Sequence, residues 1–207
     1  MAQEDADIER SAARLRLVVG LGNPGERYAR TRHNVGFMVA DRLADDTGIA
    51  FGREKFGAVF GRGRLEGNEI ILAKPNSFMN RSGPPVRALA DFFQIESREV
   101  LVIHDDIDLD YGRLKIKEKG GHGGHNGIRS LIDAFGGGDF TRLRVGIGRS
   151  DSGERVADFV LDRFLPMEAD VLPQIIDRAR DAVVTILCRG TKVGMNQFNT
   201  KLITRTD

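Results

Sequence analysis

The chain has almost no cysteine and no long apolar run, and these absences exclude several classes of protein. Cys188 is the only cysteine in the 207 residues, so no disulfide framework exists and a reducing compartment is favoured. No apolar run approaches the roughly 20 residues that span a bilayer. Residues 1–10 are acidic and lack the apolar core of a signal peptide. We therefore expect a cytoplasmic protein with no membrane segment, a disordered extension over residues 1–13 and a flexible tail over residues 201–207.

An overall excess of charge is also lacking, but charge is unevenly distributed along the chain. The formal net charge is only +1, which by itself indicates no class of partner. Residues 111–149 nevertheless hold eight Lys and Arg against three Asp and Glu, a local charge of +5. A local excess of this kind suits phosphate groups. A solvated strand face that is balanced elsewhere in the fold would carry the same charges, and the sequence leaves both interpretations open.

Signatures of nucleophilic and metal chemistry are missing as well. The sequence has no G-x-S-x-G motif around a serine, and Cys188 lies on the apolar side of the last expected helix, which favours a buried structural thiol. The runs at residues 122–125 and 104–106 approach a metal-ligand composition, but there is no cysteine pair and no H-x-x-x-H spacing, and flanking glycines hold ligands poorly. We expect no metal and no cofactor.

Expected strands and helices alternate along the chain, with no linker or internal repeat between them. With 41% hydrophobic and 29% charged residues, the composition supports both a packed core and a polar surface. Apolar periodicity predicts strands over residues 15–22, 100–103, 112–117 and 143–148, a hairpin over 56–73, and helices from Asn34, Ser82, Asn126 or Ile128, and over 168–189. The alternation indicates one α/β domain over residues 14–200, with a mixed central sheet flanked by helices.

A glycine-rich turn after the first strand matches the residue pattern of a nucleotide-binding fingerprint but lacks the helix that should follow it. Residues 20–25 read G-x-G-x-x-G, which in dinucleotide-binding proteins leads into a helix whose N-terminus faces the pyrophosphate. Here Pro24 removes one amide donor and no helical apolar period follows. The acidic residues Asp41 and Asp45 fall inside the next expected helix. A tight turn that requires glycine explains the pattern without a cofactor.

His33 and Asp105 are the first candidates for a reaction site. An ordinary histidine titrates near neutrality and serves as a general base, and a carboxylate on its far nitrogen fixes the tautomer and stabilises the charged ring. Asp105 follows the expected strand over residues 100–103, and Asn23 follows the first strand. If these strands are parallel neighbours, their ends meet at one edge of the sheet. The alternative is that His33 is only a polar loop residue.

Three asparagines on expected loops extend this candidate site. Asn23, Asn80 and Asn126 can donate to a developing oxyanion or accept from water without changing charge. Asparagine is also common in turns and helix caps, and Asn126 stands where it would cap the helix that follows. With a base and amides but no evident nucleophile, the simplest chemistry is direct attack by an activated water.

Several separated motifs, taken together, give the chain a family resemblance. They lie at residues 19–25, 31–36, 78–83, 104–109, 121–127, 142–148 and 195–199. In this order and spacing they resemble bacterial peptidyl-tRNA hydrolases, and the resemblance extends from residue 15 to about residue 200. It implies a monomeric α/β protein of the phosphorylase/hydrolase type. It also implies hydrolysis, without a metal, of the ester that joins a peptide to the 3′ ribose of tRNA.

The resemblance also implies roles for individual residues. His33 would activate the water, Asp105 would hold its basic form, and Asn23 would sense the blocked amino group of the substrate. The tRNA 3′ end and the peptide would be bound by Tyr28, Phe78, Asn80 and Asn126, with Met79 packed beside them and Asn126 also orienting the water. Lys117 and Arg144 would clamp the tRNA 5′ phosphate, assisted by Arg142. A non-catalytic RNA-binding protein on the same fold, similar to splicing factors, is the alternative.

Overall fold

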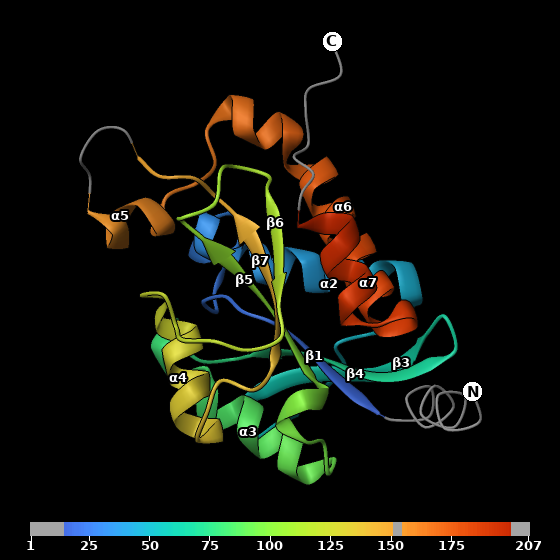
Figure 1. The fold of residues 1–207 in the computed structure, drawn as a ribbon. Coiled ribbons are helices and arrows are strands. Elements are labelled where there is room, and N and C mark those ends of the chain that lie inside the picture. The colour runs from blue at the N-terminus through green and yellow to red at the C-terminus, as the bar shows by residue number, and fades with distance from the viewer. Residues whose placement is uncertain (1–14, 151–154, 200–207) are drawn as a thin grey trace.

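A computed structural model describes residues 15–150 and 155–199, and these residues form one α/β domain around a seven-stranded mixed sheet (Figure 1). The expected fold class is confirmed. Expectations for residues 1–13 and 201–207 lie outside the described residues. None of the described helices is both long enough and apolar enough to cross a membrane.

The sheet has the strand order β2-β3-β4-β1-β5-β7-β6. Its strands are β1 (Arg16–Gly20), β2 (Arg53–Lys55), β3 (Ala58–Leu65), β4 (Asn68–Pro75), β5 (Val100–Asp106), β6 (Leu114–Lys117) and β7 (Thr141–Gly146). The four central strands β4, β1, β5 and β7 run parallel, and β2, β3 and β6 join them through antiparallel pairs. Val19 lies opposite both Ala73 and Val102. The chain therefore leaves β1, β4 and β5 at the same edge of the sheet.

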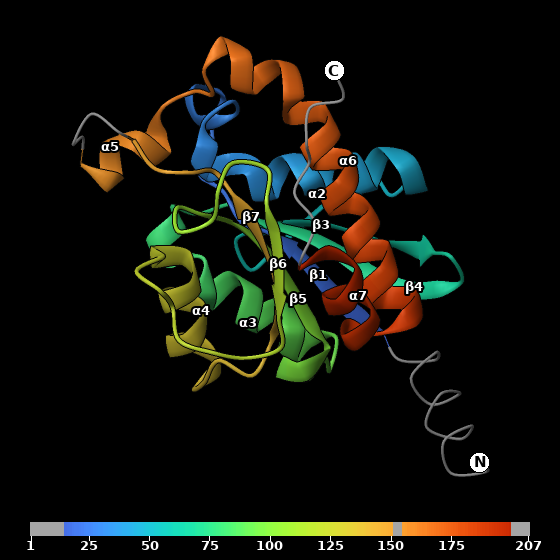
Figure 2. The same ribbon diagram turned by 45° about the horizontal axis from the view of Figure 1, so that its top comes forward.

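Helices cover both faces of the sheet (Figures 1 and 2). They are α2 (Val35–Thr47), α3 (Gly83–Phe92), α4 (Asn126–Phe135), α5 (Val156–Leu161), α6 (Pro166–Arg189) and α7 (Thr191–Phe198). Helices α2, α6 and α7 pack on one face, in a core that includes Val18, whereas α3 and α4 pack on the other, with Leu17 and Val19. Successive side chains of β1 thus enter opposite cores, which is why its sequence is continuously apolar.

The main sequence-based expectations agree with the observed elements. All expected strands are present, the hairpin of residues 56–73 is β3–β4, and α2 ends at Gly48 in the left-handed conformation (φ 68°) that glycine favours. Strand β5 runs on through Asp106, beyond the expected residue 103. Strand β2 and the helices α5 and α7 are additions that periodicity did not indicate, because each is short.

Three local expectations are wrong. Ser82 precedes α3 but does not cap it, because its hydroxyl donates to the carbonyl of Met79 at 2.9 Å. Asn126 is the first residue of α4, and the side chain that caps this helix belongs to His125. Cys188 is exposed. The buried positions near the end of α6 include Val183, Thr185, Ile186 and Leu187, and residue 188 lies just beyond the margin of this stripe.

Candidate functional site

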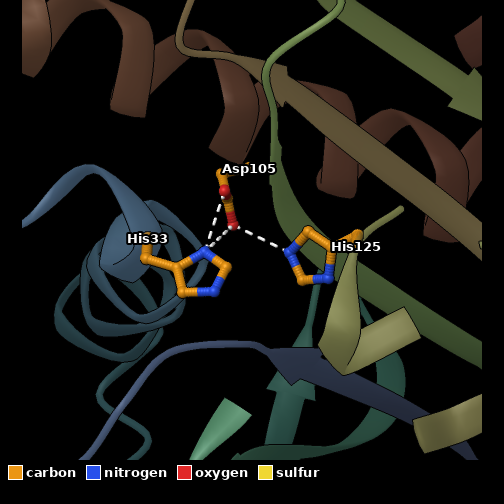
Figure 3. A group of neighbouring side chains, drawn as sticks. All are labelled: His33, Asp105 and His125. Atoms are coloured by element: carbon orange, nitrogen blue, oxygen red, sulfur yellow. Dashed lines mark hydrogen bonds and ion pairs between the residues drawn. The ribbon is translucent and has the colours of Figure 1, made fainter. Parts of the chain in front are cut away.

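The edge where β1 and β5 end brings the expected reaction residues together. Asp105 stands near the end of β5, and His33 lies in the short 3₁₀ turn η2 (Arg32–Asn34) that leads into α2. Nδ1 of His33 is 2.9 Å from each carboxylate oxygen of Asp105. Figure 3 shows the imidazole of His33 directed at this carboxylate. The sequence paired these two residues by their chemistry, as a base and its carboxylate, and the fold brings them into contact.

Asn34 fixes the backbone between Asn23 and His33. Its side-chain oxygen accepts from the backbone N–H of Asn23 at 2.9 Å, and its side-chain nitrogen donates to the carbonyl of Asn23, also at 2.9 Å. Asn34 is almost fully buried, with 2% exposure. Asn34 belongs to the motif at residues 31–36, but no role for it followed from the sequence. A buried amide that pairs two loops in this way makes no periodic sequence signal.

Arg32 fastens the other side of the turn. Its guanidinium donates to the carbonyl of Arg163 at 2.7 Å and to the carboxylate of Glu168 at 2.7 Å. The guanidinium also lies 4.3 Å from the ring centre of Phe159. Since Arg32 is held by Arg163 and Glu168, and Asn34 by the loop after β1, the ring of His33 between them starts from a fixed backbone.

A second histidine shares the carboxylate of Asp105. Nε2 of His125 lies 2.9 Å from Oδ1 of Asp105 (Figure 3). Its other ring nitrogen, Nδ1, accepts the backbone N–H groups of Gly127 and Ile128 at the start of α4, at 3.1 and 3.2 Å. A nitrogen that accepts two N–H groups carries no proton, so Nε2 is the protonated nitrogen and donates to Asp105. This role of His125 was not predicted from the sequence, where the residue stood out only in the weak metal-like run at residues 122–125.

Asp105 and His33 each stabilise the charged form of the other. Burial opposes ionisation of Asp105, but His33 and then His125 outweigh burial and hold its pKa far below the usual range. Burial likewise opposes charging of His33, and the attraction and hydrogen bonding of Asp105 outweigh it, so the pKa of His33 is raised. Asp105 is therefore an ionised acceptor for two N–H groups, and the neutral form of His33 keeps a lone pair on Nε2.

His104 supports His125 from the neighbouring position of β5. Its Nδ1 donates to the carbonyl of Asp105 at 2.7 Å, and its ring meets that of His125 edge to face, with centres 4.7 Å apart. Its Nε2 is buried without a hydrogen-bond partner among the described residues. Burial, and then the proximity of His125, hold the pKa of His104 well below its ordinary value, so this ring is neutral.

Within the described residues, His33, Asp105 and His125 are the one group whose ligand atoms approach the spacing of a metal site, all within 4.8 Å of one another. The protonation of the ring nitrogens of His125 does not fit a metal site. A metal at Nε2 of His125 would displace its proton, and a proton moved to Nδ1 would face the two backbone N–H groups that this nitrogen now accepts. The geometry suits a hydrogen-bonded charge network better than a coordination sphere.

A cleft of about 440 Å³ extends from this network toward β6 and β7. The cleft is lined by His33, Asp105 and Asn126 and also by Lys117 and Arg144, and α5 contributes a wall through Val156 and Val160. Lys117 is exposed at the last position of β6, and the Arg144 guanidinium forms an ion pair with Asp106. The expected basic residues and the expected base therefore open onto one cavity.

Arg142 lines the same cleft, but its guanidinium is bonded to backbone. The residue is 3% exposed, and it donates to the carbonyls of Gly120 and Gly121, the latter at 2.6 Å, and to that of Gly138 at 3.2 Å. Gly120 and Gly121 begin the glycine-rich loop that carries His125. Arg142 therefore holds the backbone of this loop through its hydrogen bonds.

The residues expected to bind the peptide and the tRNA end lie beside the cleft. The backbone N–H of Met79 donates to the side-chain oxygen of Asn23 at 2.8 Å, which ties the loop after β4 to the end of β1. Phe78 is exposed, and its ring meets that of Tyr28 edge to face at 6.3 Å. Asn80 is exposed on the same loop, in the turn η3 (Met79–Arg81). Apart from Asn126, none of these residues lines the cleft itself.

Comparison with known proteins identifies the family. A family model described as peptidyl-tRNA hydrolase matches residues 17–206. The chain is 48% identical over 184 residues to the peptidyl-tRNA hydrolase of Nocardia farcinica (strain IFM 10152), covering 88% of this chain and 95% of the relative. It is 47% identical over 184 residues to that of Chloroflexus aurantiacus (strain ATCC 29366 / DSM 635 / J-10-fl), covering 88% of this chain and 98% of the relative.

Solved structures agree with the sequence comparison. The structure of peptidyl-tRNA hydrolase from Acinetobacter baumannii superposes with a TM-score of 0.85 at 42% identity, covering 91% of this chain and 96% of that one. A complex of peptidyl-tRNA hydrolase with N-propanol superposes with a TM-score of 0.86 at 40% identity, covering 94% and 98%. Sequence, fold and length thus coincide, and the chain belongs to the peptidyl-tRNA hydrolase family.

Proposed function

We propose that His33 is the general base with which this peptidyl-tRNA hydrolase cleaves the ester between the peptide and the 3′ ribose of tRNA. The observation that carries the proposal is the bond from His33 Nδ1 to the buried, ionised Asp105, at 2.9 Å to both oxygens. This bond holds the proton on Nδ1 and leaves the Nε2 lone pair to accept a proton from water.

The proposed reaction needs no covalent intermediate. Nε2 of His33 takes a proton from water as the water oxygen bonds to the ester carbonyl carbon. The tetrahedral intermediate then expels the ribose 3′ oxygen, which takes the proton back from His33. The products are a peptide with a free carboxyl group and a tRNA with a free 3′ hydroxyl. Asn126 lines the cleft beside this centre, and its amide would orient the water.

The amide of Asn23 would sense the blocked amino group. Its oxygen accepts the N–H of Met79, so the side-chain group left for the substrate is the Nδ2 donor, which has no hydrogen bond within the described residues. A donor suits the carbonyl that precedes an amide nitrogen in a peptide. It opposes the ammonium group of an ordinary aminoacyl-tRNA, because both present N–H. Tyr28, Phe78 and Asn80, beside the buried Met79, would bind the tRNA 3′ end and the first part of the peptide.

Lys117 and Arg144 would bind the tRNA 5′ phosphate. Both line the same cleft as His33, from β6 and β7, and their positive charge attracts phosphate. Arg142 would contribute by holding the glycine-rich loop, because its donors already bond to backbone carbonyls. The cleft is formed within one chain, which supports action as a monomer. A substrate made in translation supports a cytoplasmic location.

The test is release of free tRNA from an N-acetylated aminoacyl-tRNA by the purified full chain. Wild type should release tRNA, and His33→Ala should lose activity by about 10²–10⁴-fold while it still binds the substrate, since general-base catalysis supplies about that factor. Substrate binding without any release by wild type would favour the RNA-binding alternative. Full activity of His33→Ala would remove His33 from the reaction.

The same assay tests the sensing role. Asn23→Asp keeps an oxygen for Met79 but replaces the donor with a carboxylate, which attracts an ammonium group. We expect the ratio of kcat/KM for N-acetylated over unblocked aminoacyl-tRNA to fall by about tenfold or more, the effect of roughly 1.4 kcal/mol from one hydrogen bond to a charged group. An equal loss of activity on both substrates would contradict the assignment.

A further inference from the structure

Two exposed phenylalanines form an aromatic patch outside the cleft. The side chains of Phe56 and Phe92 are 45% and 50% exposed, and their ring centres are 5.7 Å apart, edge to face. The ammonium group of Lys55 lies 3.6 Å from the ring centre of Phe92 and 5.1 Å from that of Phe56. We call Lys55, Phe56 and Phe92 the Phe56–Phe92 patch. It presents aromatic faces and a positive charge to the surroundings.

The backbone at Phe56 is unfavourable for phenylalanine. Phe56 and Gly57 are the two residues of the turn that joins β2 to β3, and both have positive φ, 55° and 75°. Such a turn favours asparagine, aspartate or glycine at its first position, because other residues clash there. The β3–β4 turn has the same geometry at Glu66 and Gly67, with φ of 47° and 85°, and places a charged side chain in solvent. At Phe56 neither the turn nor the core explains the aromatic ring.

The turn that carries Phe56 lies on the side of the sheet where the parallel strands end and the reaction residues gather. Ala58, just after the turn, pairs with Pro75 at the end of β4, the strand parallel to β1. The carbonyl of Gly57 accepts the backbone N–H of Asn76 at 2.8 Å, and the side chain of Asn76 donates to Glu54 at 3.2 Å. Asn76 begins the loop that carries Phe78. The β2–β3 turn is therefore hydrogen-bonded to the loop that we assign to the peptide and the tRNA end.

The order of the strands indicates how the substrate is oriented across the sheet. Lys117 and Arg144 lie on β6 and β7, at one side of the sheet. Asp105 lies on β5 and His33 follows β1, in the middle of the sheet. The turn of Phe56 joins β2 and β3 at the other side. The tRNA and the peptide lie on opposite sides of the ester. If the tRNA phosphate is bound at β6 and β7, the peptide leaves the reaction centre past Phe78, toward the patch.

We propose that the Phe56–Phe92 patch binds the peptide of peptidyl-tRNA several residues away from the ester. This inference rests on the proposed orientation of the substrate in the cleft. Aromatic faces make non-directional apolar contacts, which suit a substrate whose side chains vary, and the ammonium of Lys55 can donate to peptide carbonyls. The turn lies two to three strand spacings from β1, or about 10–14 Å, which an extended peptide covers in about three to five residues.

Substrates with peptides of different length therefore distinguish binding at the patch from binding in the cleft. The experiment compares an N-acetylated aminoacyl-tRNA, too short to reach the patch, with a hexapeptidyl-tRNA on the same tRNA. Phe56→Asn removes one ring and places a favoured residue in the turn, so the fold is kept, and Phe92→Ala removes the other ring. In each variant we expect KM for the hexapeptidyl substrate to rise by roughly two- to tenfold, the range for the loss of one aromatic contact. KM for the short substrate should stay constant.

Met167→Ala is the matched control, because Met167 is an exposed apolar side chain (66% exposed) on α6, outside the cleft and the patch. It should leave KM unchanged for both substrates. Equal increases in KM for the short and the long substrate in the phenylalanine variants would assign the patch to the tRNA and overturn the proposal. No change for either substrate would also overturn it. Hydrolysis of the short substrate by wild type tests the proposed function separately.

Discussion

Asp105 accepts N–H groups from two histidines that reach it from different elements, His33 from the turn before α2 and His125 from the start of α4. These donors explain why a fully buried carboxyl group stays ionised. Since His125 is held in one tautomer by backbone N–H groups, its contribution to Asp105 is a fixed neutral donor. Only His33 has a nitrogen left to exchange a proton with the substrate.

The pH dependence of hydrolysis should reflect this arrangement. The base form of His33 is required, and its pKa is raised, so log kcat/KM should rise with pH through a value above 6.5 and then level off. Asp105→Asn removes the charge that raises the pKa, so the inflection should move to lower pH while the plateau falls by about 10²–10⁴-fold. A pH profile of kcat/KM for both proteins measures this. An inflection that stays in place in Asp105→Asn would contradict the role of Asp105.

Secondary structure could be predicted well where a single element carried a periodic pattern. The continuous apolar runs of β1 and β5 indicated buried strands, and the meeting of Asn23 and Asp105 at one edge followed from parallel pairing. The contributions of Asn34, Arg32 and His125 could not be predicted in the same way. Each depends on a partner outside its own element, such as Glu168 for Arg32. Asn and His near helix starts are too common to indicate such partners.

Helix α2 must approach the sheet closely to place His33, and Gly36 permits this. A Cβ at Gly36 would lie 2.4 Å from the carbonyl oxygen of Ile103 and 2.6 Å from that of Leu21, both backbone atoms. Gly36→Ala should therefore lower the free energy of unfolding by about 1–3 kcal/mol, as overpacked sites do, and should lower kcat because it shifts the turn before α2. Denaturant unfolding and the hydrolysis assay measure the two effects.

Gly52→Ala is the control for this prediction, because a Cβ at Gly52 would have no neighbour within 4 Å and its φ is not in the left-handed region. It should leave stability and activity close to wild type. If Gly36→Ala were as stable as Gly52→Ala, close packing of α2 would not be the reason for glycine at this position.

On the scale of the described domain, the basic side chains of the cleft and the Phe56–Phe92 patch lie on opposite sides of the sheet. The net charge of +1 gives no sign of the basic side chains on β6 and β7. The aromatic composition likewise gives no sign of the patch by β2. Composition alone indicated no partner, and the local count over residues 111–149 was more informative. It could not show that Arg142 is buried against the backbone, since exposed and buried arginines look alike in a sequence.

Binding of tRNA should depend on salt through Lys117. Lys117→Ala should raise KM for peptidyl-tRNA and reduce the slope of log KM against log salt by about one, the effect expected for loss of one phosphate contact. Lys192→Ala changes an exposed lysine on α7, outside the cleft, and serves as the control. Steady-state kinetics over a range of salt concentrations measure both. An unchanged slope in Lys117→Ala would place the phosphate elsewhere.

The bonds between His125 and the first amides of α4 make the reaction centre sensitive to the number of residues between His125 and Gly127. Surface loops usually tolerate insertions and deletions. Here one residue added between His125 and Gly127 would change which side chain stands in front of the amides of Gly127 and Ile128. The donor to Asp105 would be lost although no reacting group had changed. At this junction the number of residues is therefore as strongly constrained as their identity.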